Sequence, residues 1–304
     1  MVAVDPRQAR TLAGAMPWVF VLIWSTGFVV ARFGMPHAPP FTFLALRYAL
    51  SLVCFLAWIV LARVEWPSTS VQWLHLAVVG VLLHAGYLGG VWAAVKAGIG
   101  AGTVALIVGL QPVLTALWIT WGASRSASGR EATHVTARQW LGLGLGLGGL
   151  ALVVWHKLGG GEVTPRNLAL AVLALLCITT GTLYQKRFVA ACDVRSASAI
   201  QLFAAFAATL PLAMLESESL VWHPHLIGAL AWSVLLLTLG GSSLLYLLIQ
   251  RGAATRVTSL MYLVPPCTAL LAWALFGEAF TWSMLAGMLM TVSGVAMVVR
   301  TAAT

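Results

Sequence analysis

Long apolar runs recur along the whole chain, separated by short breaks of proline, glycine and charged residues. Within each run the apolar residues surround the expected helix on all sides, whereas a soluble helix would show a single apolar stripe. A helix of about 20 residues crosses the roughly 30 Å hydrocarbon core of a membrane, and the runs have this length. The pattern therefore predicts an all-α membrane protein with ten transmembrane helices.

The breaks divide the chain into ten expected spans. They lie near residues 12–32, 42–62, 72–96, 102–122, 138–156, 167–185, 197–215, 227–250, 257–277 and 281–299. The first run follows Arg7 and Arg10 and has no small-residue cleavage site behind it, so we expect it to remain as a membrane anchor. The spans fall into two sets of five, which predict domains at residues 12–156 and 167–300.

Composition agrees with a membrane protein. Hydrophobic residues make up 61% of the chain and charged residues 8%, whereas a typical soluble domain has about 25% charged residues. The net charge of +9 would suit nucleic acid, but the basic residues lie singly or in pairs between apolar runs, so no nucleic-acid partner is expected. The four cysteines share no C-x-x-C spacing, so neither disulfides nor a zinc site is indicated.

The basic residues also predict the orientation. If the N-terminus is cytoplasmic, twelve lie on that side: Arg7, Arg10, Arg63, Arg125, Arg130, Arg138, Lys186, Arg187, Arg195, Arg251, Arg256 and Arg300. Four lie on the other side, namely Arg32, Lys96, Lys157 and Arg166, while Arg47 stays inside a span. Basic residues favour the cytoplasmic side. We therefore expect a multi-pass protein of the cytoplasmic (inner) membrane with both termini in the cytoplasm.

An internal repeat relates the two halves. The motif P-x-x-T-A-L begins at Pro112 in the fourth span and again at Pro265 in the ninth. Three further matches keep the same order: Arg32-Phe33 with Arg187-Phe188, Val104 with Val257, and the Gly142 to Gly149 spacing with that of Gly287 to Gly294. Because five is odd, the second set of spans enters the membrane in the opposite sense, as in many secondary transporters. We predict two inverted five-helix repeats.

Further segments carry a family resemblance. They are Leu22-Ile23-Trp24-Ser25-Thr26-Gly27-Phe28, Leu44-Ala45-Leu46-Arg47-Tyr48, Gly252-Ala253-Ala254, Tyr262-Leu263-Val264-Pro265 and Phe276-Gly277-Glu278. Over nearly its whole length the chain resembles the EamA branch of the drug/metabolite transporter superfamily. The resemblance implies ten helices around a central cavity, alternating access, and export of small metabolites, amino acids or drugs. One place departs from the family, since Ala123-Ser124-Arg125 stands in the first repeat where the second has Gly277-Glu278.

Polar side chains inside spans are the candidates for substrate binding, because an unpaired polar group in hydrocarbon is costly. Arg47 is the one full charge that we place well inside a span. It either binds an anionic or carboxylate group of the substrate, or clamps neighbouring helices through their backbone carbonyls, or extends its charged end toward the membrane surface. His84 lies one turn before Tyr87 on the same face. It either binds substrate or a proton, or packs as a neutral histidine.

The remaining candidates share the expected cavity. Trp24 and Ser25 in the first span match Thr180 and Tyr184 in the sixth, and equivalent polar positions favour a common site. The predicted substrate-binding residues are Trp24, Ser25, Arg47, His84, Tyr87, Gln111, Thr180, Tyr184, Ser243, Tyr246 and Tyr262. Pro112 and Pro265 each remove a backbone donor and permit a kink, which is either a hinge or a static bend.

Motifs for catalysis or ATP use are absent. The chain has no Walker lysine loop, no H-E-x-x-H and no G-x-S-x-G, so we expect a non-enzyme without cofactor or metal. Residues 144–149 contain G-x-G-x-x-G, but this segment lies within a span. Glycines four residues apart, such as Gly142 and Gly146, let another helix approach closely.

The leading hypothesis is a secondary transporter that exports small metabolites or amino acids across the cytoplasmic membrane by alternating access. Proton antiport and facilitated diffusion are both open, because His84 and Glu278 are among few titratable groups near the expected path. The alternative is a non-transporting sensor or lipid-handling enzyme on a carrier-like fold. The expected partners are a small-molecule substrate and membrane lipid, with the chain a monomer or weak homodimer.

Overall fold

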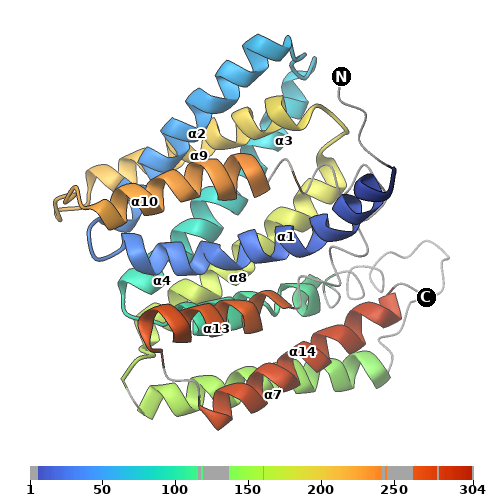
Figure 1. Cartoon of the computed structure of the whole chain (residues 1–304), viewed down its shortest axis with the longest axis vertical. Helices are drawn as coiled ribbons and strands as arrows, with labels where there is room; N and C mark the ends of the chain where they lie inside the picture. Colours follow the sequence, from blue (N-terminus) through green and yellow to red (C-terminus); the bar gives the residue numbers. More distant parts are fainter. Residues whose placement is uncertain are drawn as a thin grey trace.

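The structure is a computed structural model that describes residues 6–115, 118, 137–159, 161–241, 244, 263–278 and 281–302. Throughout these residues the chain forms helices joined by short connections. The start of α1 (Pro6–Gly34) and the end of α14 (Trp282–Ala302) lie at the same end of the molecule, on the right of Figure 1. An even number of crossings produces this arrangement.

The first repeat contains five spans. After α1 come α2 (Pro40–Ala62), a third span of α3 (Ser70–Gly80), η1 (Val81–Leu88) and α4 (Gly89–Lys96), then α5 (Ala101–Val108) and α7 (Ala137–Gly159). The second repeat contains α8 (Pro165–Phe188), α9 (Val194–Met214), an eighth span of α10 (Pro224–Trp232) and η2 (Ser233–Gly241), then α13 (Val264–Phe276) and α14. Both η segments are π-helical and occupy the third span of their repeats.

Ten apolar helical stretches follow the predicted spans in order. Those long and apolar enough to cross a membrane alone are Pro40–Ala62, Ser70–Lys96, Pro165–Phe188, Val194–Met214 and Pro224–Gly241. The shorter stretches, within the described residues, are Trp18–Gly34, Ala101–Thr115, Trp140–Trp155, Val264–Phe276 and Trp282–Met297. The predicted all-α membrane fold of two five-helix repeats is confirmed.

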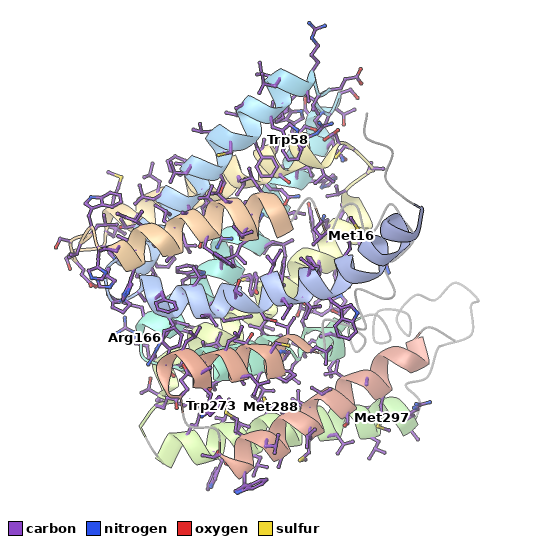
Figure 2. All side chains as sticks on the ribbon, viewed as in Figure 1. Met16, Trp58, Arg166, Trp273, Met288 and Met297 are labelled. Atoms are coloured by element: carbon purple, nitrogen blue, oxygen red, sulfur yellow. The ribbon has the colours of Figure 1, made fainter. Side chains whose placement is uncertain are left out.

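Large apolar side chains cover the outside of the bundle. Leu61 and Trp282 are each 85% exposed, and Trp155 is 79% exposed. Trp58 and Trp273, which Figure 2 labels, are exposed as well. A soluble protein with such a surface would aggregate. Hydrocarbon is a good solvent for these side chains, so the surface fits a membrane-embedded protein.

Prolines and capping side chains begin several of the helices. Pro40, Pro165 and Pro224 each occupy the first turn, where the missing N–H costs no helix hydrogen bond. At the start of α8, the Asn167 N–H donates to Thr164 Oγ1 at 3.3 Å and the Thr164 N–H donates to Asn167 Oδ1 at 2.8 Å. This reciprocal pair is a capping box, and it fixes where the second repeat begins.

Matching helices of the two repeats pack against each other. The pairs α2 with α9, α5 with α13 and α7 with α14 each join equivalent spans (Figure 1). Among the contacts between unlike spans, two correspond to each other: α1 contacts α10 and η2 of the eighth span, and α8 contacts η1 and α4 of the third. Two related five-helix units that pack about a common axis produce this pattern of contacts.

The glycines that repeat between the fifth and tenth spans lie in the seam between α7 and α14. A Cβ on Gly149 would clash with the carbonyl oxygen of Gly287, and a Cβ on Gly294 would clash with that of Gly142. The absence of side chains therefore lets the two backbones touch. This contact explains the matched glycine spacing in the sequence.

We expect Gly294→Leu to destabilise the protein by on the order of 3 kcal/mol, because the new side chain must displace the α7 backbone. Gly144→Leu is the matched control, since a Cβ at Gly144 meets nothing within 4 Å. Thermal unfolding in detergent, followed by fluorescence-detected size-exclusion chromatography, measures the difference. Equal melting temperatures for the two variants would contradict the backbone contact.

Candidate functional site

A helix break in the fourth span meets the start of α13 between the repeats. The fourth span, expected to be continuous, stops at the end of α5, and helix resumes just before Pro112. Pro265 likewise lies in the first turn of α13, where its missing N–H costs no hydrogen bond. A Cβ on Gly109 would clash with the Pro265 ring, so the break in the fourth span and the start of α13 are in contact. A hinge role for either proline stays a prediction.

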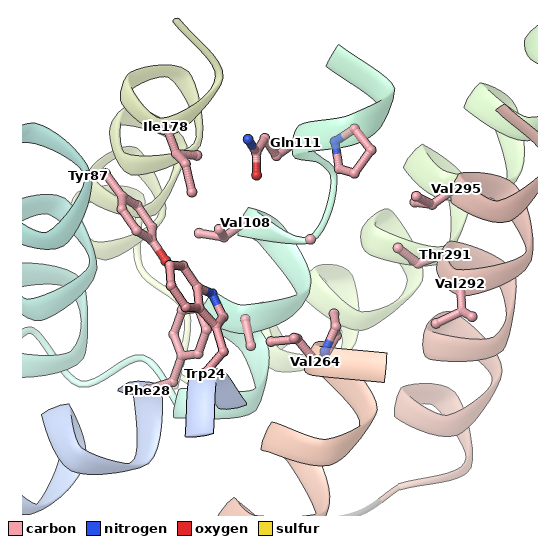
Figure 3. A pocket seen from close by; sticks show the side chains of 14 residues that line it. Trp24, Phe28, Tyr87, Val108, Gln111, Ile178, Val264, Thr291, Val292 and Val295 are labelled. Carbon is pink, nitrogen blue, oxygen red and sulfur yellow. The ribbon is translucent and has the colours of Figure 1, made fainter. Parts of the chain in front are cut away.

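A cavity of about 80 Å³ lies beside this contact. Its wall comes from spans one, three, four, six, nine and ten (Figure 3). Trp24, Phe28 and Tyr87 supply aromatic surface, Gln111 supplies an amide, and much of the rest is aliphatic. A small ligand in this cavity could contact aromatic rings and form hydrogen bonds with a side-chain amide.

Several predicted site residues line this cavity. They are Trp24, Tyr87, Gln111, Pro112 and Pro265. The Gln111 Nε2 donates to Thr182 Oγ1 on α8 at 3.1 Å. This bond connects the two repeats at the cavity wall and restricts the position of the amide.

Ser25 joins helices instead of lining the cavity. The residue is buried, and its hydroxyl donates to the carbonyl oxygen of Val21 at 2.7 Å. Its own carbonyl oxygen accepts a bond from the Thr268 hydroxyl at 3.1 Å. Ser25 therefore stabilises the contact between α1 and α13, behind the cavity wall to which Trp24 contributes.

Thr180 and Tyr184 also lie away from the cavity. The Thr180 hydroxyl donates to the carbonyl oxygen of Leu176 on its own helix at 2.7 Å. Tyr184 Oη forms a 2.9 Å hydrogen bond with His75 Nδ1 and so links α8 to α3. The other predicted residues Ser243, Tyr246 and Tyr262 lie outside the described residues, as does the 123–125 segment.

Arg47 is buried between α2 and the eighth span. It is 6% exposed, and its Nε and Nη2 donate to Thr238 Oγ1 at 3.2 and 3.1 Å. The Thr238 hydroxyl in turn donates to the Ser233 carbonyl oxygen at 2.8 Å. No salt bridge links Arg47 to a carboxylate in the part of the chain that the structure describes. Arg47 therefore links α2 to the eighth span through a side-chain hydroxyl, where the clamp interpretation expected backbone carbonyls, and both the clamp and the anion-binding role stay predictions.

Tyr48, the next residue of α2, binds the other π-helical segment. Its hydroxyl donates to the carbonyl oxygen of His84 in η1 at 2.8 Å. The His84 side chain interacts with Gln201 of α9. The segments η1 and η2 are equivalent in the two repeats. Two adjacent residues of α2 therefore contact both repeats, Tyr48 through η1 and Arg47 through η2. π-Helical turns are rare in proteins overall, and those that occur are often found at functional sites.

Sequence reasoning missed three members of this polar cluster: Tyr48, Gln201 and Thr238. The sequence gives only one weak indication of this cluster, which is the position of Tyr48 directly after Arg47. Thr238 lies 191 residues from Arg47 in an otherwise apolar run, so its pairing depends on the packing of the two repeats.

Two glutamates bind the start of α5. This contact lies at the end of the molecule opposite the start of α1 and the end of α14. Glu162 Oε1 accepts the Gly100 N–H and Glu278 Oε1 accepts the Ala101 N–H, each at 3.0 Å. A helix N-terminus carries unpaired N–H groups and partial positive charge, so carboxylates stabilise it. Glu278, whose counterpart the first repeat lacks, therefore connects α13 to α5.

Two further glutamates join the repeats at the same end. Glu216 accepts the N–H groups of Phe41 and Thr42, at 2.9 and 2.8 Å, at the start of α2. Glu218 forms a 2.5 Å ion pair with Lys96 at the end of α4. Both glutamates belong to the connection between α9 and α10, so this connection of the second repeat holds two helix ends of the first.

Two packed five-helix repeats with a small cavity between them have the architecture of a membrane carrier. The chain belongs to the EamA-like transporter family, whose sequence model matches residues 15–155 and again residues 166–300. The resemblance derived from the sequence is confirmed, and the protein is a membrane transporter of small molecules.

Curated relatives match almost the whole chain. A protein of Salmonella typhimurium (strain LT2) described as a "Probable amino-acid metabolite efflux pump" is 24% identical over 92% of this chain and 92% of its own length. "Uncharacterized transporter YvbV" of Bacillus subtilis (strain 168) is 25% identical over 91% and 88%. A crystal structure with 20% identity superposes with a TM-score of 0.61, covering 96% of this chain and 98% of the other. The structural likeness supports the fold alone.

We expect Thr238→Val to lower the free energy of unfolding by about 2–3 kcal/mol, because the buried Arg47 loses its hydrogen-bond acceptor. Thr179→Val is the matched control, since the Thr179 hydroxyl, also buried, donates only to the Leu175 carbonyl oxygen of its own helix among the bonds described. Chemical unfolding in detergent micelles compares the variants. A loss no larger for Thr238→Val than for the control would contradict the clamp.

Proposed function

We propose that the protein exports amino acids or related small metabolites across the cytoplasmic membrane by alternating access. The efflux names of two relatives support the substrate class and direction, since the Escherichia coli (strain K12) relative, 22% identical, carries the same description as that of Salmonella. The distribution of basic residues supports cytoplasmic termini.

The cavity between the two repeats is the proposed substrate site. The observation that carries this proposal is the position of the cavity, where the helix break at Gly109 touches Pro265 at the start of α13. Trp24 and Tyr87 offer surface for an apolar or aromatic side chain, and Gln111 offers hydrogen bonds to a polar group. Behind this wall, His84 holds the span of Tyr87 to α2, since its carbonyl oxygen accepts the Tyr48 hydroxyl, and Arg47 holds α2 to the eighth span.

The small cavity and the contacts at one end of the molecule support alternating access. The cavity is smaller than the roughly 300–1,000 Å³ of common ligand pockets, so the helices must separate before substrate enters. Glu216, Glu278 and the Lys96–Glu218 pair tie the repeats together at the end opposite the termini. With cytoplasmic termini this is the external end, and its contacts must break and re-form in each transport cycle.

The test is transport by the purified protein in liposomes loaded with radiolabelled amino acids, small metabolites or lipophilic cations. Saturable efflux of amino acids, competed by unlabelled analogues, is the expected result. Runs with and without a pH gradient separate proton antiport from facilitated diffusion. Saturable flux of another compound class alone would refute the substrate assignment, and absence of any saturable flux would refute the carrier itself.

We expect Trp24→Ala to reduce substrate affinity or flux at least about tenfold, the loss that follows from roughly 1.4 kcal/mol of lost contact. Trp273→Ala removes an equally large aromatic that is 55% exposed and outside the cavity wall, and we expect it to transport as the wild type does. Initial rates in liposomes with equal amounts of protein compare them. Equal flux in both variants would exclude Trp24 from the substrate site.

A further inference from the structure

Three histidines meet at the end of the molecule opposite the termini, apart from the cavity. His37 lies in the turn between α1 and α2, while His223 and His225 begin α10. Each residue offers one ring nitrogen, and the three nitrogens lie within 4.8 Å of one another. The rings of His37 and His223 stack with centroids 4.1 Å apart, and the rings of His223 and His225 are 4.7 Å apart.

Backbone contacts hold these histidines together. The Val221 N–H donates to the carbonyl oxygen of His37 at 2.9 Å, so the segment before His223 is tied to the α1–α2 turn. Phe33 packs edge-on against the ring of His225 at 5.7 Å. The cluster therefore does not arise from flexible side chains that happen to meet, since its backbone is fixed by the contact between the two repeats.

We propose that His37, His223 and His225 form a binding site for a divalent transition-metal ion such as Zn²⁺ or Co²⁺. Imidazole nitrogens are good ligands for these ions, and three histidines with an open fourth position, filled by water, suit tetrahedral coordination. His225 is exposed, so an ion from solution reaches the site without crossing the membrane.

Coordination requires small changes in the cluster. His223 Nδ1 now accepts the His225 N–H at 3.1 Å, so its ring must turn and give up this bond to bind through a free lone pair. The stacked rings of His37 and His223 must also rotate until their nitrogens converge. The nearby Lys96 ammonium opposes a cation, but its ion pair with Glu218 compensates its charge.

A bound ion would join the α1–α2 turn of the first repeat to the start of α10 in the second. It would reinforce the contacts that Val221 and Glu216 already make between the same two connections. The proposal concerns metal binding and does not depend on which substrate the carrier moves.

The experiment is a Co²⁺ titration of the full-length protein in detergent, purified with an affinity tag that contains no histidine. We expect one tight Co²⁺ site per chain, with the intense visible absorption of four-coordinate Co²⁺. His37→Gln and His225→Gln should each weaken binding at least about tenfold. His75→Gln, which removes the histidine paired with Tyr184 on α8, is the control and should bind as the wild type does.

His223→Asn separates metal binding from folding. Asparagine is a good helix N-cap, so this variant keeps an acceptor for the start of α10 and removes the imidazole. We expect it to keep the wild-type melting temperature without metal and to lose the rise in melting temperature that Zn²⁺ gives the wild type. Equal Co²⁺ affinity in the wild type, His225→Gln and His75→Gln would overturn the proposal, as would absence of a tight site in the wild type.

Discussion

Hydrocarbon offers no hydrogen bonds, so each polar group buried in a membrane protein must find its partner within the protein. The contacts of Arg47 and Tyr48 meet this constraint at the centre of the structure. Arg47 binds Thr238 in the second repeat, and Tyr48 binds the His84 carbonyl oxygen in the first. Since an unpaired buried charge costs several kcal/mol, these bonds fix α2 in one register between the π-helical segments.

The same constraint explains why polar contacts gather at one end of the molecule while the cavity wall is mostly apolar. At the end opposite the termini, the free N–H groups of α2 and α5 are bound by carboxylates, of which Glu216 and Glu278 come from the second repeat. Around the cavity the wall is mostly aromatic and aliphatic, so it can separate without leaving charges unpaired. A carrier needs both properties: specific contacts that close an end, and a centre that tolerates movement.

The sequence predicted the fold well because its signals are local. Run length, proline and glycine breaks and charge bias depend on neighbouring residues. The glycine echo predicted the repeat, whereas the contact of these glycines between α7 and α14 came from the structure. The site was predicted less completely: Trp24, Tyr87 and Gln111 line the cavity, whereas Ser25 and Tyr184 pair with other helices. Spacing along a helix shows which residues share a face, but the rotation of that helix against its neighbours depends on packing across the whole chain.

The Arg47–Thr238 bond also constrains biosynthesis. The two residues are 191 positions apart, and span eight emerges from the ribosome long after span two has entered the membrane. Throughout that interval Arg47 has no Thr238 to bind, and its long side chain must reach toward the water-rich interface. The hydrogen bonds that Arg47 makes in the finished structure therefore form only after span eight has entered the membrane, so this contact of α2 is completed late, by the second repeat.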